Sequence, residues 1–226
     1  MSVTTEVKIN TSKLPTSPAR EEYYIPPVAH PNGSTVYLAV KRVFDFLVAL
    51  VGLIVVAIPM GIVAILIKLD SPGPVIYRQE RLGKDGKPFN ILKFRSMRCD
   101  AEENGAQWAD KDDPRVTRVG NILRKTRIDE LPQLVNILKG QMSMVGPRPE
   151  RPMFYEEFET YIHGFSNRLV VTPGLTGLAQ ISGGYDLLPE EKIRYDMEYI
   201  RTQSLLLDIK CLLRTVGIVF NHNGAR

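Results

Sequence analysis

The strongest pattern in the chain is an apolar block in its first third. The segment from Phe46 to Ile67 contains no charged residue, and as a helix it would be about 33 Å long, close to the hydrocarbon thickness of a bilayer. A core helix of a soluble protein is rarely apolar on every face over such a length. The block therefore predicts insertion into a membrane.

Pro59 lies inside this apolar block. A proline removes a backbone hydrogen bond and clashes with the preceding turn, at a cost of about 3 kcal/mol in a regular helix, so we expect a kink or a reversal. Cations stand on both sides of the block, with Lys41 and Arg42 before it and Lys68 after it, so charge alone does not orient it. These residues leave a kinked full span and a re-entrant hairpin over residues 37–70 equally open.

The segments on either side of the block differ in character. Residues 1–36 are rich in Thr, Ser, Pro and charged residues, which predicts a mostly disordered N-terminal tail. Turn signals at residues 31–34 favour a linker just before the apolar block. Residues 71–226 are numerous enough for one domain with a core of its own.

Two strand-like runs open this second part of the chain. They cover residues 75–79 and 89–95, and an Asp-Gly turn signal stands between them, which predicts a small β-hairpin. Alternation along the second strand puts Lys93 and Arg95 on one face and apolar residues on the other. The two cations can form a solvated outer face or an anion site that contacts phosphate.

Two adjacent carboxylates, Asp129 and Glu130, open the next regular pattern. Thr117 is a plausible N-cap for a helix that ends before them. Apolar residues then recur at helical spacing over residues 131–138, and Gly140 is a stop signal. Asp129 is thus expected at a helix N-terminus. There it can cap the helix, or it can attack a phosphate that the free amides and the helix dipole attract.

A carboxylate that attacks phosphorus needs cations or Mg²⁺ to neutralise the phosphate oxygens that it approaches. Arginines flank the acidic pair, and Arg148 stands between two prolines that narrow the directions it can take. A planar guanidinium held in this way suits bidentate phosphate binding, although a rigid surface turn explains it too. The predicted substrate-binding residues are Lys93, Arg95, Arg124, Arg127 and Arg148, and the predicted Mg²⁺ ligands are Asp129 and Glu130.

Composition narrows the classes of function. The chain has 29 Lys and Arg against 25 Asp and Glu, a net charge of +4 and a pI near 9.0, which favours anionic partners. It has no recognised nucleic-acid module, so we expect phosphorylated metabolites or lipids and no nucleic acid. Cys99 and Cys211 are too few for a disulfide scaffold. The three histidines lie far apart in the sequence, which gives a zinc site little support.

Two further stretches have amphipathic helical patterns. Phe154, Phe158 and Ile162 form an apolar stripe, and residues 205–220 are apolar but carry Asp208 and other charges, too many for a membrane span. Either stretch can lie in the membrane surface as an interfacial helix or pack on the domain core.

In their order along the chain, these segments resemble the bacterial sugar transferase family, the monotopic phosphoglycosyl transferases that start exopolysaccharide, capsule or related glycan assembly on a polyprenyl phosphate. The resemblance covers residues 41–220 and rests on KRVFDF, SPGPVIYRQERLG, FNILKFRSM, DPRVTRVGNILRKTRIDELPQLVNILKGQMSMVGPRP and VTPGLTGLAQISG. With it we expect a mainly helical α+β fold. An N-terminal re-entrant membrane helix-break-helix would precede a cytoplasmic-face catalytic domain with a small β-hairpin and amphipathic interfacial helices.

The resemblance also implies roles for single residues. Asp129 matches the nucleophile of the family's Asp-Glu dyad, with Glu130 as its partner. Arg124 and Arg148 match positions that we assign to the diphosphate. Pro59 matches the proline that breaks the family's membrane helix into a re-entrant hairpin, although Ile58 stands where the family often has Ser.

The reaction implied by the resemblance has two steps. Asp129 attacks the sugar-bearing phosphate of a nucleoside-diphosphate sugar, expected to be a UDP-sugar, and UMP leaves. Undecaprenyl phosphate then takes the sugar 1-phosphate from the aspartyl intermediate, with Mg²⁺ as cofactor. Expected partners are therefore UDP-sugar, undecaprenyl phosphate and membrane lipid, with a second copy or other glycan-assembly proteins as further partners. The sequence does not identify the sugar.

An alternative from another class is a catalytically silent, membrane-anchored scaffold of a glycan-assembly complex. Its mark would be nucleotide-sugar binding without UMP release.

Overall fold

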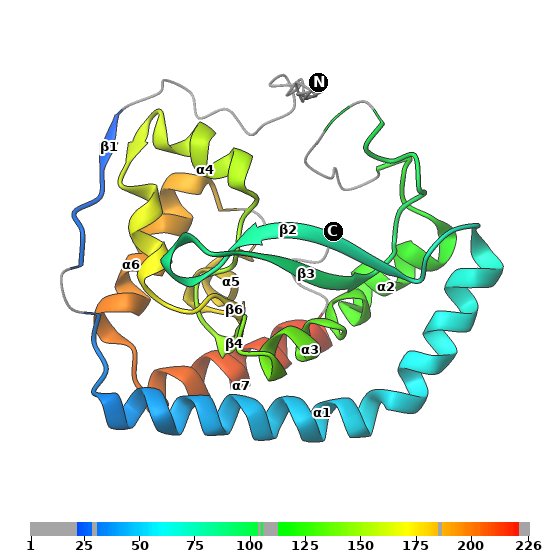
Figure 1. Ribbon diagram of the computed structural model, residues 1–226, viewed down its shortest axis with the longest axis horizontal. Helices are drawn as coiled ribbons and strands as arrows, with labels where there is room; N and C mark the ends of the chain where they lie inside the picture. The colour runs from blue at the N-terminus through cyan, green and yellow to red at the C-terminus, as the bar shows by residue number, and fades with distance from the viewer. Residues whose placement is uncertain (1–21, 29–30, 104, 106–112, 185–186, 222–226) are drawn as a thin grey trace, which may run out of the picture.

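One long helix runs along one face of the molecule, and the shorter elements gather on its inner side (Figure 1). The computed structural model describes residues 22–28, 31–103, 105, 113–184 and 187–221, with side chains up to residue 218. The helices are α1 (Thr35–Asp70), α2 (Arg118–Thr126), α3 (Gln133–Leu138), α4 (Pro152–Glu159), α5 (Leu178–Ser182), α6 (Pro189–Thr202) and α7 (Leu205–Asn221), with 3-10 turns η2 (Lys84–Gly86), η3 (Ile128–Glu130) and η4 (Phe165–Val170).

The strands are short and pair two by two. They are β1 (Tyr23–Tyr24), β2 (Ile76–Leu82), β3 (Pro88–Phe94), β4 (Ser143–Val145), β5 (Ile162–His163) and β6 (Gly174–Thr176). Within the described residues, β2 and β3 pair antiparallel, whereas β1 with β5 and β4 with β6 pair parallel. The predicted mainly helical α+β class is confirmed.

Helix α1 contains the predicted apolar block. Its most apolar 18-residue stretch has a mean hydropathy of 3.0 and is only 11% buried within the protein. A core helix of a soluble protein would be mostly buried, so this exposed apolar surface indicates association with lipid. Pro59 lies inside α1, and Figure 1 shows the helix changing direction in its C-terminal part. The break is thus a bend within one helix, and the re-entrant path through a membrane stays a prediction.

The charged residues near the start of α1 form an ion pair and hydrogen bonds with the domain. Lys41 Nζ lies 2.8 Å from Asp208 Oδ2 on α7. Arg42 donates from Nη1 to the Ile137 carbonyl at 2.7 Å and caps the end of α3. Asp45 Oδ1 accepts a hydrogen bond of 3.0 Å from the amide of Met144. Lys41 and Asp45 are buried against the domain, so these charges are kept away from the apolar side of the same helix.

The rest of α1 packs on the domain through apolar side chains. Ala49 is fully buried against a cluster that includes Leu134 and Ile137 of α3. Further along, Ile67 belongs to a second cluster with Phe94 of β3 and Leu123 of α2. The helix therefore contacts the domain along most of its length, on the side opposite its exposed apolar residues.

The predicted hairpin is confirmed, and both strands reach closer to the turn than predicted. β2 and β3 pair so that Tyr77 lies opposite Lys93. The turn uses left-handed backbone at Asp85 (φ 57°) and Gly86 (φ 71°), which short polar residues and glycine tolerate best.

One sequence interpretation needs correction, and one open alternative is decided. Part of the predicted disordered tail is ordered, because β1 pairs with β5 and the Ile25 amide donates to the His163 carbonyl at 2.8 Å; residues 1–21 lie outside the described part. Of the two alternatives for the apolar stripe of residues 154–162, packing on the domain core is confirmed, since Phe154 and Phe158 of α4 and Ile162 of β5 are buried in one cluster. Among the predicted interfacial helices, α7 keeps large exposed apolar residues.

Gly120 lets α2 approach the end of β3, and its replacement tests this contact. A Cβ at Gly120 would lie 2.0 Å from the Ser96 carbonyl oxygen, whereas one at Gly217 of α7 would meet nothing within 4 Å. We expect Gly120→Ala to lower the free energy of unfolding by about 1–3 kcal/mol. Gly217→Ala, the control, should leave it unchanged or raise it by up to about 1 kcal/mol. Thermal unfolding in detergent compares them, and equal midpoints would contradict the packing described.

Candidate functional site

A tight chain reversal after α2 places the two carboxylates. Thr117 caps α2 as predicted, accepting a hydrogen bond of 3.0 Å from the Gly120 amide. The helix ends at Arg127, whose left-handed backbone (φ 56°) is unusual for a residue other than glycine. The 3-10 turn η3 follows and contains Asp129 and Glu130.

The capping interpretation of Asp129 is wrong. Helix α3 begins at Gln133 with Pro132 as its N-cap residue, and no side chain caps it. Asp129 therefore lies in the turn before the helix, because Leu131 and Pro132 occupy the first-turn positions that the apolar periodicity had assigned to the helix. The predicted stop is confirmed, since Gly140 adopts a left-handed conformation (φ 76°) directly after α3.

Glu130 is held by two cations. Both of its carboxylate oxygens accept hydrogen bonds from the Arg148 guanidinium, and Lys93 Nζ lies 3.2 Å from Oε1. Burial alone would raise the pKa of this carboxyl, but Arg148 and Lys93 outweigh it and lower the pKa well below its usual value. Glu130 is therefore ionised and fixed in orientation.

Asp129 is the less constrained of the two acids. Within the described residues, no group donates a hydrogen bond to its carboxylate, which is 8% exposed. The pKa of Asp129 is raised to about 6, because burial and then the charge of Glu130 raise it more than Lys93, Arg148 and Arg124 lower it. At neutral pH Asp129 is thus mostly an unpaired carboxylate beside several cations. Neighbouring acids with such different surroundings are typical of a catalytic pair.

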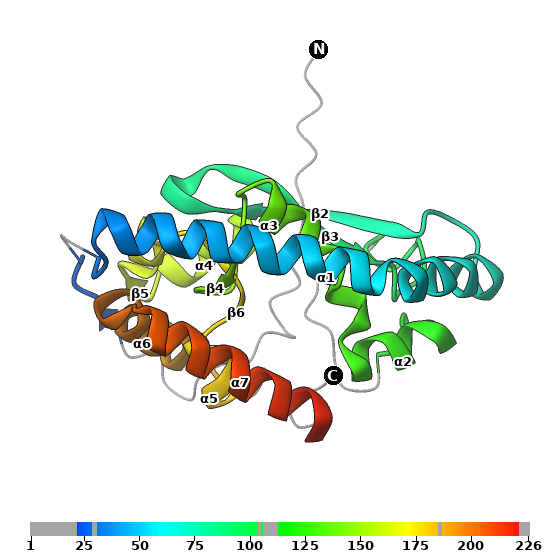
Figure 2. The same cartoon turned by 90° about the horizontal axis from the view of Figure 1, so that it is seen from below.

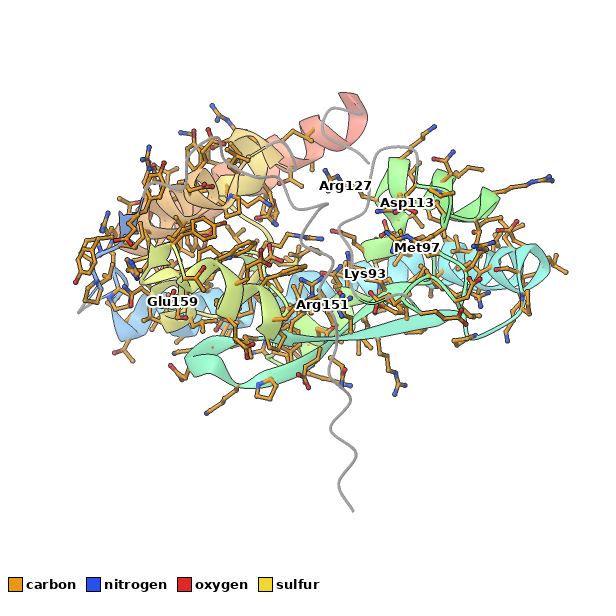
Figure 3. All side chains as sticks on the ribbon, turned by 90° about the horizontal axis from the view of Figure 1, so that it is seen from above. Lys93, Met97, Asp113, Arg127, Arg151 and Glu159 are labelled. Atoms are coloured by element: carbon orange, nitrogen blue, oxygen red, sulfur yellow. The ribbon has the colours of Figure 1, made fainter. Side chains whose placement is uncertain are left out.

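All seven predicted site residues line one cavity of about 1320 Å³. Figure 3 shows Lys93 and Arg127 in the central part of the molecule, with Glu159 well away from them on α4. Arg124 Nη1 is buried and, within the described part of the chain, has no hydrogen-bond partner. The predicted residues come from β3, α2, η3 and the loop after β4, so folding brings together four separate segments.

Arg95 has a structural task that the sequence did not reveal. Its guanidinium donates to the carbonyls of Ser71, at 2.7 Å, and Pro72, just beyond the end of α1. The solvated outer face does not describe Arg95, which is 5% exposed. Arg95 thus provides hydrogen-bond donors for the carbonyl groups just after the C-terminal end of α1. Its contact with substrate stays a prediction.

Arg148 is itself supported by a buried ion pair that the sequence analysis did not predict. Arg168 of η4 donates to the Arg148 carbonyl at 2.6 Å and pairs with Asp196 of α6 at 2.7 Å, with both side chains 2% exposed. The Arg168 guanidinium also lies over the Phe165 ring, 5.1 Å from its centroid. No local motif marks Asp196, because its role depends on a contact between distant segments.

The donor set limits which metal the site can hold. Within the described residues, no group of three or more His, Cys, Asp and Glu side chains forms a metal-binding cluster. Asp129 has free carboxylate oxygens, whereas both oxygens of Glu130 already accept from cations. Mg²⁺ fits such a site, because it commonly takes one or two carboxylates and completes its shell with substrate phosphates and water.

The acidic pair and its arginines line one cavity, and the long apolar helix indicates a membrane-associated protein. The family model for "Bacterial sugar transferase" matches residues 36–222. The chain therefore belongs to the bacterial sugar transferase family, as the resemblance indicated.

Three relatives have related names. The chain is 62% identical over 134 residues to a putative undecaprenyl-phosphate N-acetylgalactosaminyl 1-phosphate transferase of Bacillus subtilis (strain 168), covering 59% of this chain and 74% of that protein. It is 44% identical to the UDP-N-acetylgalactosamine-undecaprenyl-phosphate N-acetylgalactosaminephosphotransferase of Aeromonas hydrophila, over 85% of this chain and 46% of that protein. It is also 44% identical to the UDP-glucose:undecaprenyl-phosphate glucose-1-phosphate transferase of Escherichia coli (strain K12), over 82% of this chain and 41% of that protein. The chain thus spans less than half the length of the last two.

The Arg168 and Asp196 pair predicts a large effect of a small substitution. Asp196→Asn removes the carboxylate that pairs with the buried Arg168 guanidinium, so we expect the free energy of unfolding to fall by about 3 kcal/mol or more. Asp100→Asn is the matched control, because Asp100 pairs with Arg98 at 3.3 Å on the exposed surface and should change stability by less than about 1 kcal/mol. Thermal unfolding in detergent measures both, and equal effects would contradict a supporting role for the buried pair.

Proposed function

We propose that the protein transfers a sugar 1-phosphate from a UDP-sugar to undecaprenyl phosphate and releases UMP. The observation that carries this proposal is the contrast between the two acids: Glu130 is fixed by cations, whereas Asp129 is unpaired and faces the same cavity. The names of the relatives support this pair of substrates. Such a product would prime exopolysaccharide, capsule or related glycan synthesis.

In the proposed first step, the Asp129 carboxylate attacks the sugar-bearing phosphorus. The phosphoanhydride bond breaks, UMP leaves with the bonding electrons, and an aspartyl phosphosugar remains. In the second step, a phosphate oxygen of undecaprenyl phosphate attacks the same phosphorus, and Asp129 leaves as a carboxylate. Lys93, Arg124 and Arg148 surround Asp129 closely enough to affect its pKa, so they are placed to offset the charge of the phosphates.

We assign Mg²⁺ to Asp129 together with substrate phosphate oxygens, and not to the acidic pair as a whole. Glu130 serves instead to hold Arg148 and Lys93 in position, because both cations contact its carboxylate. When bound, the ion would neutralise phosphate charge and favour the approach of a carboxylate to phosphorus.

We further propose that α1 enters and leaves the membrane on its cytoplasmic face. Lys41, near the start of α1, binds Asp208, and Arg95 of the same domain binds Ser71 at the other end. A bilayer core is about 30 Å thick, so one folded domain cannot contact both ends of a helix that crosses it completely. The bend that accompanies Pro59 is consistent with a hairpin in one leaflet.

Replacement of Asp129 tests the proposed nucleophile. The protein, in detergent with Mg²⁺ and undecaprenyl phosphate, is given a panel of UDP-sugars that includes UDP-N-acetylgalactosamine and UDP-glucose. We expect Asp129→Asn to abolish UMP release and the phosphosugar adduct seen by intact-protein mass spectrometry, because an amide is not a comparable nucleophile.

Glu130→Gln is the matched control for this experiment. It should slow UMP release by about 10²-fold, because Arg148 and Lys93 lose the charge that positions them, yet still permit the adduct. UMP release by Asp129→Asn at the normal rate would assign the nucleophile elsewhere. Nucleotide-sugar binding without any UMP release by the unsubstituted protein would favour the scaffold alternative.

Cysteine labelling tests the topology. Val36 and Arg78 are exposed and lie on either side of the apolar block, and the exposed native thiol of Cys99 is removed by Cys99→Ser. With Val36→Cys or Arg78→Cys in this background, a membrane-impermeant maleimide should label both positions from the cytoplasmic side only. Labelling from opposite sides would establish a full span.

A further inference from the structure

The cavity beside Asp129 has an apolar wall that the proposed phosphate chemistry does not use. Helix α7 contributes Leu212, Thr215, Val216 and Ile218 to the lining. The charged residues Lys210 and Arg214 of the same helix are exposed and do not line the cavity. Helix α7 thus presents an uncharged side to a cavity that the arginines also line.

The cavity is large enough to hold more than one chemical group of the substrates. Pockets for small ligands usually measure about 300–1,000 Å³, whereas this cavity measures about 1320 Å³. The charged half around Asp129 suits the diphosphate and the polar sugar. Burying sugar hydroxyls against Val216 and Leu212 would leave them without hydrogen-bond partners, which is unfavourable.

Helix α7 is held firmly enough to form a defined wall. At its start, Asp208 binds Lys41 of α1 and accepts a hydrogen bond of 2.8 Å from the Tyr199 hydroxyl of α6. Along the helix, the hydroxyls of Thr215 and Thr176 lie 2.7 Å apart and join α7 to the end of β6.

The same helix reaches the surface that associates with lipid. Leu206 and Leu213 are 78% and 69% exposed and do not line the cavity. Figure 2 shows α7 on the same face of the molecule as α1. Helix α7 therefore has exposed apolar residues on one side and lines the cavity that contains Asp129 with others.

We infer that the cavity side of α7 binds the isoprenoid chain of the acceptor, while the nucleotide-sugar stays on the side of the hairpin and the arginines. An anionic head with a long apolar tail matches both halves of the cavity, by charge at one end and by hydrophobicity at the other. The inference rests on the proposed function, and it assigns to α7 a role in the acceptor step alone.

Val216→Trp tests this inference, with Leu213→Trp as the control on the outer side of the same helix. A tryptophan at Val216 fills the wall, so the KM for undecaprenyl phosphate should rise by about tenfold or more. The burst of UMP from UDP-sugar and Mg²⁺ without acceptor should keep its amplitude. The KM for a short-chain, water-soluble polyprenyl phosphate should change little, and Leu213→Trp should behave as the unsubstituted protein in all three measurements.

The outcomes separate this inference from the proposed function. If the unsubstituted protein gives no UMP burst, the proposed function itself fails. If Val216→Trp has a normal burst and an unchanged KM for undecaprenyl phosphate, only the role of α7 is overturned. If the burst of Val216→Trp is also lost, photolabelling of the unsubstituted protein with a benzophenone-ended polyprenyl phosphate decides: a label on residues 205–218 supports the inference, and a label only elsewhere overturns it.

Discussion

The contact of Glu130 with Arg148 and Lys93 is the interaction on which the site depends. It joins three segments, because Glu130 lies on η3, Lys93 on β3 and Arg148 in the loop after β4. Without the Glu130 charge, two cations would face each other in a partly buried cavity, and mutual repulsion would separate them. The same contact leaves Asp129 as the acid without a partner. The reactivity that we propose for Asp129 is therefore a property of its neighbour.

The membrane helix takes part in this arrangement. Arg42 binds the end of α3, the helix that follows the acidic pair, and Asp45 binds the amide of Met144 on β4, the strand that leads to Arg148. Two charged residues of α1 thus fix the two chain segments that hold Glu130 and Arg148. The site is therefore attached directly to the apolar helix, which suits the proposed reaction between a soluble and a lipid-embedded substrate.

The sequence predicted those features that depend on local chemistry. The hairpin followed from strand alternation and an Asp-Gly turn, and the membrane helix followed from an uncharged block of bilayer length. The seven residues predicted for the site were chosen from cations and acids in short motifs, and they line one cavity; their roles stay predictions. The position of Asp129 was misjudged, since helical periodicity does not show that α3 begins only at Gln133, after a 3-10 turn that contains Asp129. The pair of Arg168 and Asp196, and the use of Arg95 at the end of α1, depend on contacts between distant segments, which no local pattern encodes.

The contacts along α1 also bear on how the protein is made. Before α1 meets the domain, Lys41 and Asp45 would be unpaired polar groups next to lipid, and Phe94, Leu123 and Leu134 would be apolar residues without cover. Helix α1 and the domain thus each have surfaces that only the other covers. We therefore expect insertion of the helix and completion of the domain core to be coupled. The domain without its helix would expose an apolar, aggregation-prone face to water.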